Sequence, residues 1–208
     1  ARADLARDGI MRGDLDYTDG AVGNALSHIT LWRRVVAQAR PLTIAEDDAV
    51  FNKAFVFWSQ KVLRDLAGQY DIIHWGFNFD AVLTYEFLPG ISTSSAVFSQ
   101  ASLRQALGRF QNFDFAPSIY RLRAAFGLPC YSLSPEGAER LLAQCLPLVP
   151  MRKTFPGCLE PTANTAIDVA MSVAYPTLRA FVALPPLVVT PNVHETSTVQ
   201  PPSHPHPS

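Results

Sequence analysis

Charge is scarce in this sequence, and neither sign dominates. Charged residues make up 17% of the 208 residues, below the share of about 25% that is usual in globular proteins. Lys and Arg together number 17 and Asp and Glu number 18, so the formal net charge is −1. Such a chain has no overall positive electrostatic field that would attract nucleic acid, and we expect no nucleic-acid partner. Because 48% of the residues are hydrophobic, the chain can bury a core and is not expected to be disordered.

Cysteines and long apolar runs are also scarce. The three cysteines, Cys130, Cys145 and Cys158, are odd in number and form no CxxC pair, which argues against a disulfide framework or a zinc–thiolate site. The sequence has no apolar run of about 18 residues, the length needed to cross a membrane. The first residues also lack the apolar segment of a signal peptide. We therefore expect a cytoplasmic protein without a transmembrane segment, and peripheral contact with the inner face of the membrane stays open.

Apolar and polar segments alternate in a way that is typical of an α/β fold. The predicted helices span residues 25–39, 49–67, 135–145 and 166–174, and the predicted strands span residues 42–45, 71–75, 94–99, 130–133 and 181–189. Ser134 and Pro135 predict the N-cap and the first position of the third helix. Pro185 and Pro186 interrupt the last strand, which favours a place at the edge of the sheet.

The pattern predicts one folded domain. It covers residues 20–198 and follows an N-terminal segment at 1–19. Residues 199–208 are rich in proline and histidine, with no apolar side chain after Val199. We expect this end of the chain to be an extended or disordered tail.

Three adjacent acids, Glu46, Asp47 and Asp48, directly follow the predicted strand at 42–45. In open α/β sheets, ligands bind beyond the carboxyl ends of the strands. Two ionised carboxylates about 6 Å apart repel by roughly 3 kcal/mol at an effective dielectric near 20, and a divalent cation would remove that repulsion. Ligands that are all oxygen suit Mg²⁺ or Mn²⁺ better than zinc. The alternative is that these acids begin the helix predicted at 49–67, where first-turn acids favour the helix dipole.

Four blocks of sequence, taken in order, carry a resemblance to a known family. Residues 20–32, GAVGNALSHITLW, match a segment G-x-x-G-x-x-L-S-H-x-x-x-W, and residues 45–48, AEDD, match a strand end L-E-D-D. Residues 131–142, YSLSPEGAERLL, match a-Y-x-x-S-x-x-G-A-x-x-L-L without its first residue, and residues 166–171, AIDVAM, are similar to a late P-x-D block. The chain thus resembles glycosyltransferase family 25, the lipopolysaccharide and lipooligosaccharide glycosyltransferases related to collagen galactosyltransferases.

The resemblance implies a GT-A-like nucleotide-sugar-binding fold, a mixed sheet flanked by helices. It also implies inverting transfer of a hexose, often galactose, from a UDP-sugar to a glycan or glycolipid acceptor. A divalent metal, Mn²⁺ or Mg²⁺, would be bound by Glu46, Asp47 and Asp48. The sequence departs from the family in two places. No counterpart of the family's first strand, V-I-N-L-x-x-x-x-x-R, precedes Gly20, and Asn24 stands where the family commonly has Cys.

The late block contains the candidate catalytic base, Asp168. Inverting transfer needs one group to take the proton of the acceptor hydroxyl, and a carboxylate bound to the metal is a poor base. The alternative for Asp168 is a structural acid near the start of a helix.

Five further residues are candidates for binding the donor or substrate. Ser27 and His28 belong to the first block, although a lone helical histidine is commonly a packed or capping residue. His74 and Asp80 flank the aromatic segment 75–79, which contains Asn78 and lies at the end of the predicted strand at 71–75. This segment could stack on a sugar and hydrogen-bond to it. The alternative is that this loop packs its own aromatic rings on the core.

Two other functions stay open at this point. A catalytically inactive relative could serve as a binding or scaffold module, which the missing first strand favours. A metal-dependent hydrolase could use the same three acids, but the sequence lacks the His and Asp spacings of two-metal hydrolases.

Overall fold

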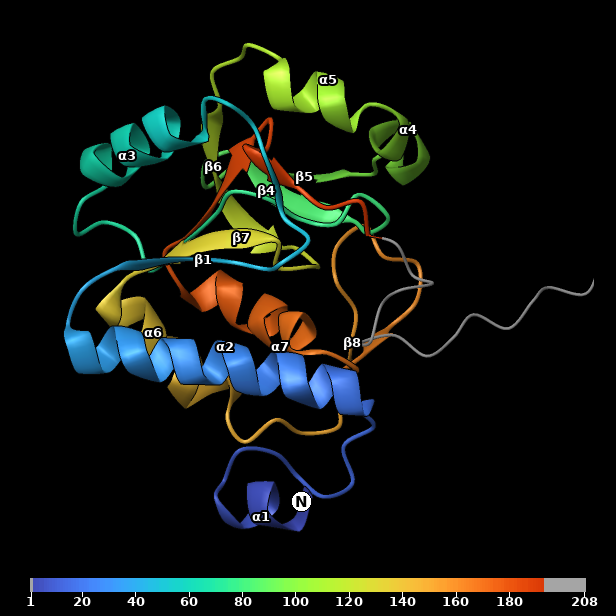
Figure 1. The fold of residues 1–208 in the computed structure, drawn as a ribbon. Coiled ribbons are helices and arrows are strands. Elements are labelled where there is room, and N and C mark those ends of the chain that lie inside the picture. Colours follow the sequence, from blue (N-terminus) through green and yellow to red (C-terminus); the bar gives the residue numbers. More distant parts are fainter. Residues whose placement is uncertain (1, 193–208) are drawn as a thin grey trace, which may run out of the picture.

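The computed structural model describes residues 2–192, and the tail predicted at 199–208 lies outside them (Figure 1). The central element is a seven-stranded sheet in which β3 and β10 run parallel and all other neighbours run antiparallel. In spatial order its strands are β1 (Leu42–Ala45), β7 (Cys130–Leu133), β3 (Ile72–His74), β10 (Ala180–Leu184), β6 (Ser118–Ala124), β4 (Leu83–Leu88) and β5 (Ser92–Ala96). The sheet is therefore mixed, as predicted.

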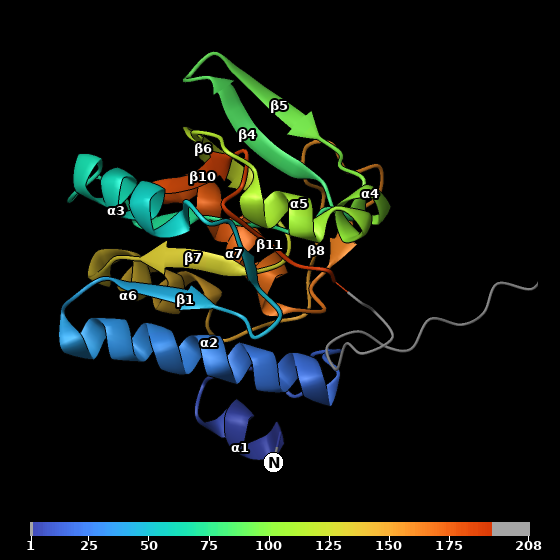
Figure 2. The same ribbon diagram turned by 45° about the horizontal axis from the view of Figure 1, so that its top comes forward.

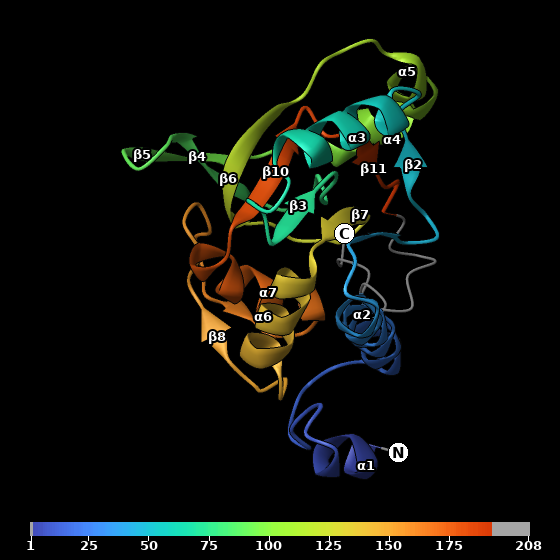
Figure 3. The same ribbon diagram turned by 90° about the vertical axis from the view of Figure 1, so that its left-hand side faces the viewer.

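Helices cover both faces of this sheet (Figures 2 and 3). One face carries α2 (Asp19–Gln38), α6 (Pro135–Cys145) and α7 (Ile167–Ala174), and the other carries α3 (Phe55–Asp65), α4 (Gln100–Gln105) and α5 (Leu107–Asn112). The short helix α1 (Arg2–Arg7) lies beyond α2. This arrangement confirms the predicted α/β class and is consistent with a GT-A-like fold. Within residues 2–192, no helix is long and apolar enough to span a membrane.

Two small sheets complete the fold. One pairs β2 (Val50–Phe51) with β11 (Val188–Val189), and the other pairs β8 (Arg152–Lys153) with β9 (Thr162–Ala163). A single 3₁₀ turn, Tyr175–Thr177, links α7 to β10.

The main core fills the space between the sheet and the layer of α2, α6 and α7. Among its fully buried side chains are Trp32 of α2, Tyr131 of β7 and Met171 of α7. A smaller core on the opposite face contains Ile73 and Trp75. Both faces of the central strands are therefore buried, as expected for a sheet between two helical layers.

Residues before α2 also join the main core. The side chains of Ile10, Met11, Leu15 and Tyr17 are each less than 9% exposed and pack in that cluster. Met11 forms a parallel bridge to Leu148. The segment at 1–19 thus packs against the α/β domain, while the predicted domain division stays a prediction.

Local signals explain where two of the helices begin. Ser134 caps α6 by accepting a hydrogen bond from Gly137 N at 3.0 Å, and Pro135 occupies the first turn, as predicted. Gly137 is required because a Cβ there would lie 2.1 Å from the carbonyl oxygen of Asp71. Helix α2 begins at Asp19, before the predicted position 25, because Thr18 Oγ1 accepts from Ala21 N at 3.1 Å.

The helix predicted at 49–67 is wrong at its start. Val50 and Phe51 form β2, because they pair with β11 from the far end of the chain, and α3 begins only at Phe55. The first turn of α3 contains no acidic residue. Residues 46–48 therefore do not begin a helix, and the simpler explanation of the acidic triplet is excluded.

The edge strand predicted at 181–189 is also wrong. β10 lies inside the sheet between β3 and β6, and residues 188–189 form the separate strand β11. Pro185 and Pro186 follow the last residue of β10, so they end the strand and remove no hydrogen bond from its ladder.

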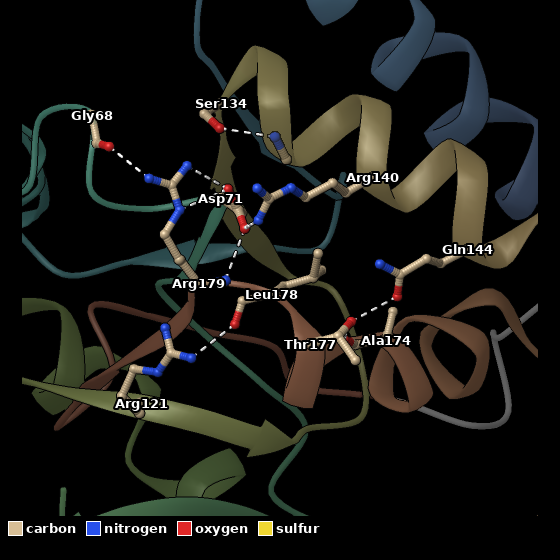
Figure 4. Close-up of polar contacts among 11 residues, drawn as sticks. Gly68, Asp71, Arg121, Ser134, Arg140, Gln144, Ala174, Thr177, Leu178 and Arg179 are labelled. Atoms are coloured by element: carbon tan, nitrogen blue, oxygen red, sulfur yellow. Dashed lines mark hydrogen bonds and ion pairs between the residues drawn. The ribbon is translucent and has the colours of Figure 1, made fainter. Parts of the chain in front are cut away.

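A buried ion cluster fixes the start of β3 (Figure 4). Asp71 is 0% exposed, and its carboxylate accepts from Arg179 Nη2 at 2.6 Å and from Arg140 Nη1 at 2.8 Å. The backbone N–H of Arg179 donates to the same carboxylate at 2.8 Å. One side chain thereby joins the beginning of β3 to α6 and to the segment that enters β10.

Candidate functional site

A cavity of about 1200 Å³ lies where β1 ends and where α2 and α7 begin. β1 runs back along α2, so the end of β1 lies over the first half of that helix (Figure 2). The cavity is lined by the residues after β1, by the first turns of α2 and α7, and by residues 190–192 at the end of the described chain. The acidic triplet and the late block, far apart in sequence, therefore share one cavity.

The charges around this cavity are mainly of one sign. Among residues 2–192, its lining contains five carboxylates and no Lys or Arg. The five are Asp16, Glu46, Asp47, Asp48 and Asp168. A phosphate group entering the cavity would be repelled by these carboxylates unless a cation accompanied it.

Asp168 lies in the first turn of α7 and faces the cavity. Its Oδ2 accepts a hydrogen bond from Gly127 N at 2.7 Å, while its Oδ1 is buried without a hydrogen-bond partner among the described residues. Burial raises the pKa of Asp168 above its usual range, and the nearby charge of Glu46 adds to this effect; hydrogen bonds from two backbone N–H groups oppose it. A carboxylate with one free oxygen and a raised pKa is suited to accept a proton.

Glu46 is held in place by two side chains of α2. Asn24 Nδ2 donates to Glu46 Oε1 at 3.0 Å, and His28 Nε2 lies 3.5 Å from the same oxygen. Asn24 is the residue that departs from the family pattern, and here it fixes a carboxylate of the cavity.

The tautomer of His28 follows from its buried partners. Trp32 Nε1 donates to Tyr131 Oη at 2.9 Å, and His28 Nδ1 lies 2.8 Å from the same hydroxyl. Because the indole can only donate, the Tyr131 hydroxyl is free to donate to Nδ1, which leaves the proton on Nε2 facing Glu46. His28 is thus a buried residue that orients a carboxylate.

Asp47 and Asp48 present oxygens that could hold a metal. Asp47 is exposed and makes no hydrogen bond or ion pair with another residue of the described chain. Asp48 Oδ2 accepts from the Thr190 hydroxyl, which leaves its other oxygen open. No group of three or more His, Cys, Asp or Glu side chains converges on one point within residues 2–192. The oxygen donors nevertheless fit Mg²⁺ or Mn²⁺, since such ions keep several waters and take substrate phosphates as ligands.

The candidate binding residues separate into two groups. Ser27 and Asn78 line the cavity, and Ser27 Oγ donates to Gly23 O at 3.0 Å. Asp80 lies just outside the lining and accepts from Asn192 Nδ2 at 2.8 Å.

His74 does not reach the cavity. It is 0% exposed, with its ring stacked on Tyr131 at 5.8 Å and edge-on to Tyr175 at 5.1 Å between centroids. Burial lowers the pKa of His74 to about 4, so the ring is neutral near pH 7. The sequence suggested a sugar contact because His74 lies at a strand end beside an aromatic loop, but the structure packs its ring against Tyr131 and Tyr175 in the core.

Several residues of the site were missed in the sequence. Tyr131 belongs to a recognised block but points to His28 across 103 positions, and Asp16 and Thr190 carry no local pattern. Only the pairing of residues 50–51 with residues 188–189 would have indicated that Thr190 lies beside the acidic triplet.

Comparison with protein families places the chain. No curated protein matches the chain. The model of the family described as glycosyltransferase family 25 (LPS biosynthesis protein) matches residues 14–154, which include α2, the acidic triplet and α6. Asp168 and Thr190 lie beyond the matched residues and are brought to the same cavity by the fold. The chain belongs to glycosyltransferase family 25 and is a glycosyltransferase.

Proposed function

We propose that this protein transfers a hexose, with galactose the first to test, from a UDP-sugar to a glycan or glycolipid acceptor with inversion of the anomeric centre. The observation that carries the proposal is the cavity itself. It gathers the acidic triplet from the end of β1 and Asp168 from the start of α7. Inverting transfer needs these two kinds of carboxylate, one set near the leaving diphosphate and one base near the acceptor.

A divalent cation, Mn²⁺ or Mg²⁺, belongs to this proposal. Glu46, Asp47 and Asp48 would hold it. Glu46 would use Oε2, because Asn24 and His28 both contact its Oε1. When bound, the ion supplies positive charge that neutralises a departing diphosphate. The acidic lining without Lys or Arg supports such a cation, since nothing else in the lining would balance a diphosphate.

Asp168 would act on the acceptor. Its carboxylate, in which Oδ1 has no hydrogen-bond partner among residues 2–192, takes the proton of the acceptor hydroxyl while the acceptor oxygen bonds to the anomeric carbon of the sugar. The bond from that carbon to the diphosphate oxygen breaks with its electron pair, and UDP leaves. The hydrogen bond from Gly127 N holds the carboxylate in position during this step.

Replacement of Asp48 tests the metal role. We expect UDP-sugar binding to require Mn²⁺ or Mg²⁺ and to weaken by at least about 10–100-fold in Asp48→Ala, because loss of even an indirect metal partner commonly costs that much. Calorimetric titration of UDP-galactose with and without Mn²⁺ measures both effects. Asp114→Ala is the matched control, since Asp114 is an exposed acid that pairs with Lys53 outside the cavity lining. Metal-independent binding with unchanged affinity in Asp48→Ala would contradict the proposal.

A further inference from the structure

Residues 190–192, here called the strap, line the cavity from the end of the described chain. They lie 36 positions or more beyond the part of the chain that matches the family model, which ends at 154. The strap contributes Thr190, Pro191 and Asn192 to the lining. It contains a threonine, Thr190, that lies in none of the sequence blocks and outside the family match.

The pairing of β2 with β11 places the strap next to the acidic triplet. Val188 pairs with Phe51 and Val189 with Val50 in antiparallel register. Continuing this register by one residue sets Thr190 opposite Ala49, beside Asp48. The hydrogen bond from Thr190 Oγ1 to Asp48 Oδ2 follows from this placement.

Two side chains of α4 bind the strap. Gln100, at the start of α4 and 8% exposed, donates from Nε2 to the carbonyl oxygens of Thr190 at 3.1 Å and Pro191 at 2.9 Å. Its Oε1 accepts from Phe79 N at 3.2 Å. Arg104 donates to the carbonyl oxygens of Pro191 and Asn192. The strap is therefore tied to α4 and to the loop after β3.

The Thr190 side chain is itself fully engaged. It is 3% exposed, and its hydroxyl accepts from Asn192 N at 2.9 Å while donating to Asp48. Asp48, in contrast, is exposed, lines the cavity and has no other hydrogen-bond donor within residues 2–192. A buried, anchored hydroxyl thus sets the orientation of an exposed carboxylate.

We propose that Thr190 is a positioning residue that holds the Asp48 carboxylate in the orientation in which it binds the divalent cation. The proposal rests on the proposed function, in which Asp48 helps to hold the divalent cation. With one oxygen fixed by Thr190, the carboxylate offers the other in a single orientation and loses less side-chain freedom when a cation binds.

The test compares Thr190→Val, Thr190→Ser and Thr84→Val by titrating MnCl₂ calorimetrically into protein mixed with a fixed concentration of UDP. Valine keeps the shape of threonine and removes the hydroxyl, whereas serine keeps the hydroxyl. We expect Thr190→Val to weaken Mn²⁺ binding by about 10–100-fold and Thr190→Ser to restore it to near the wild-type value. Thr84 is the matched control, because it is also buried and its hydroxyl is also bonded, to Ser95 and to Pro156 O, outside the cavity lining.

A double-mutant cycle separates positioning from general damage. If Thr190 acts through Asp48, adding Thr190→Val to Asp48→Ala should weaken Mn²⁺ binding no further. Should Thr190→Val fail to fold, Thr190→Ala removes the same hydroxyl without the branched side chain and takes its place.

Equal Mn²⁺ affinity in the wild type and in Thr190→Val would overturn the positioning role while leaving the proposed function intact. An equal loss in Thr84→Val would also overturn it. A wild-type protein that binds no Mn²⁺ with UDP would instead refute the metal role in the proposed function, and the positioning role with it.

Discussion

Asp168→Asn is expected to lower the rate of sugar transfer by about 10²–10⁴-fold, the usual contribution of general-base assistance. The fold and the affinity for the UDP-sugar should stay near the wild-type values. The amide oxygen of asparagine can still accept from Gly127 N, but the side chain can no longer take up a proton. Turnover and calorimetric binding of the UDP-sugar, measured on the same sample, check the two halves of this expectation.

The pH dependence of transfer adds a second readout. Burial raises the pKa of Asp168, and a protonated carboxyl cannot act as a base. The wild-type rate should therefore fall as the pH drops through this raised pKa, and the fall should disappear in Asp168→Asn. Glu139→Gln, on the exposed side of α6, is the control that should change neither property.

Normal turnover in Asp168→Asn would show that Asp168 is a structural acid of α7. Loss of metal-dependent donor binding would place it with the metal ligands instead. A wild-type protein that binds the UDP-sugar without turnover would favour an inactive binding module over the proposed transfer.

Asp71→Ala is expected to destabilise the protein by about 3 kcal/mol, near the lower end of the range for breaking a buried ion pair. The lower end applies because the side chains left behind, Arg140 and Arg179, are 48% and 35% exposed and can regain water. For a chain of this size the loss corresponds to a melting temperature about 6–12 °C lower. Thermal unfolding of Asp71→Ala beside Asp65→Ala measures it. Asp65 pairs with Lys61 on the exposed surface of α3, and its loss should cost less than about 1 kcal/mol.

The same cluster makes stability depend on pH in one direction. Burial alone would raise the pKa of Asp71, but hydrogen bonds and charge from Arg179, with the charge of Arg140, outweigh it and lower this pKa below its usual value. The stabilisation is therefore complete above the pKa of an unfolded Asp, about 3.9, and is lost as the pH falls through the lower folded pKa. Wild-type protein should lose this part of its stability below about pH 4, and Asp71→Ala should show a smaller acid dependence. Equal acid dependence in both proteins would rule out Asp71 as the source.

Elements with strong local signals were predicted correctly from the sequence. β1 and β7 span 42–45 and 130–133, as predicted, and α6 begins at a Ser–Pro cap. The start of α3 was wrong because the β partner of residues 50–51 lies more than 130 positions away. β6 was missed although Leu122 and Ala124 alternate with Arg121 and Arg123, the period-2 pattern of a strand with one buried face.

The candidate site was also predicted only in part. The resemblance drew attention to the acidic triplet and to Asp168, and the fold places them in one cavity, while their roles stay proposals. The partners that orient these acids could not be predicted. Tyr131 and Thr190 act across 103 and 142 positions, and no local pattern records a hydrogen bond that only the assembled sheet makes possible.

The interior position of β10 has a consequence for how the protein is made. Its flanking strands, β3 and β6, end at residues 74 and 124, and β10 joins the two halves of the sheet only after residues 180–184 have been synthesised. At about 5–20 residues per second, the ribosome needs roughly 3–12 s to add the sixty residues from the end of β6 to the end of β10. During that interval both strands have an unpaired edge, which is a template for pairing with another chain. The growing polypeptide should therefore be most prone to aggregation, and most dependent on chaperones, in the seconds before its last long strand emerges.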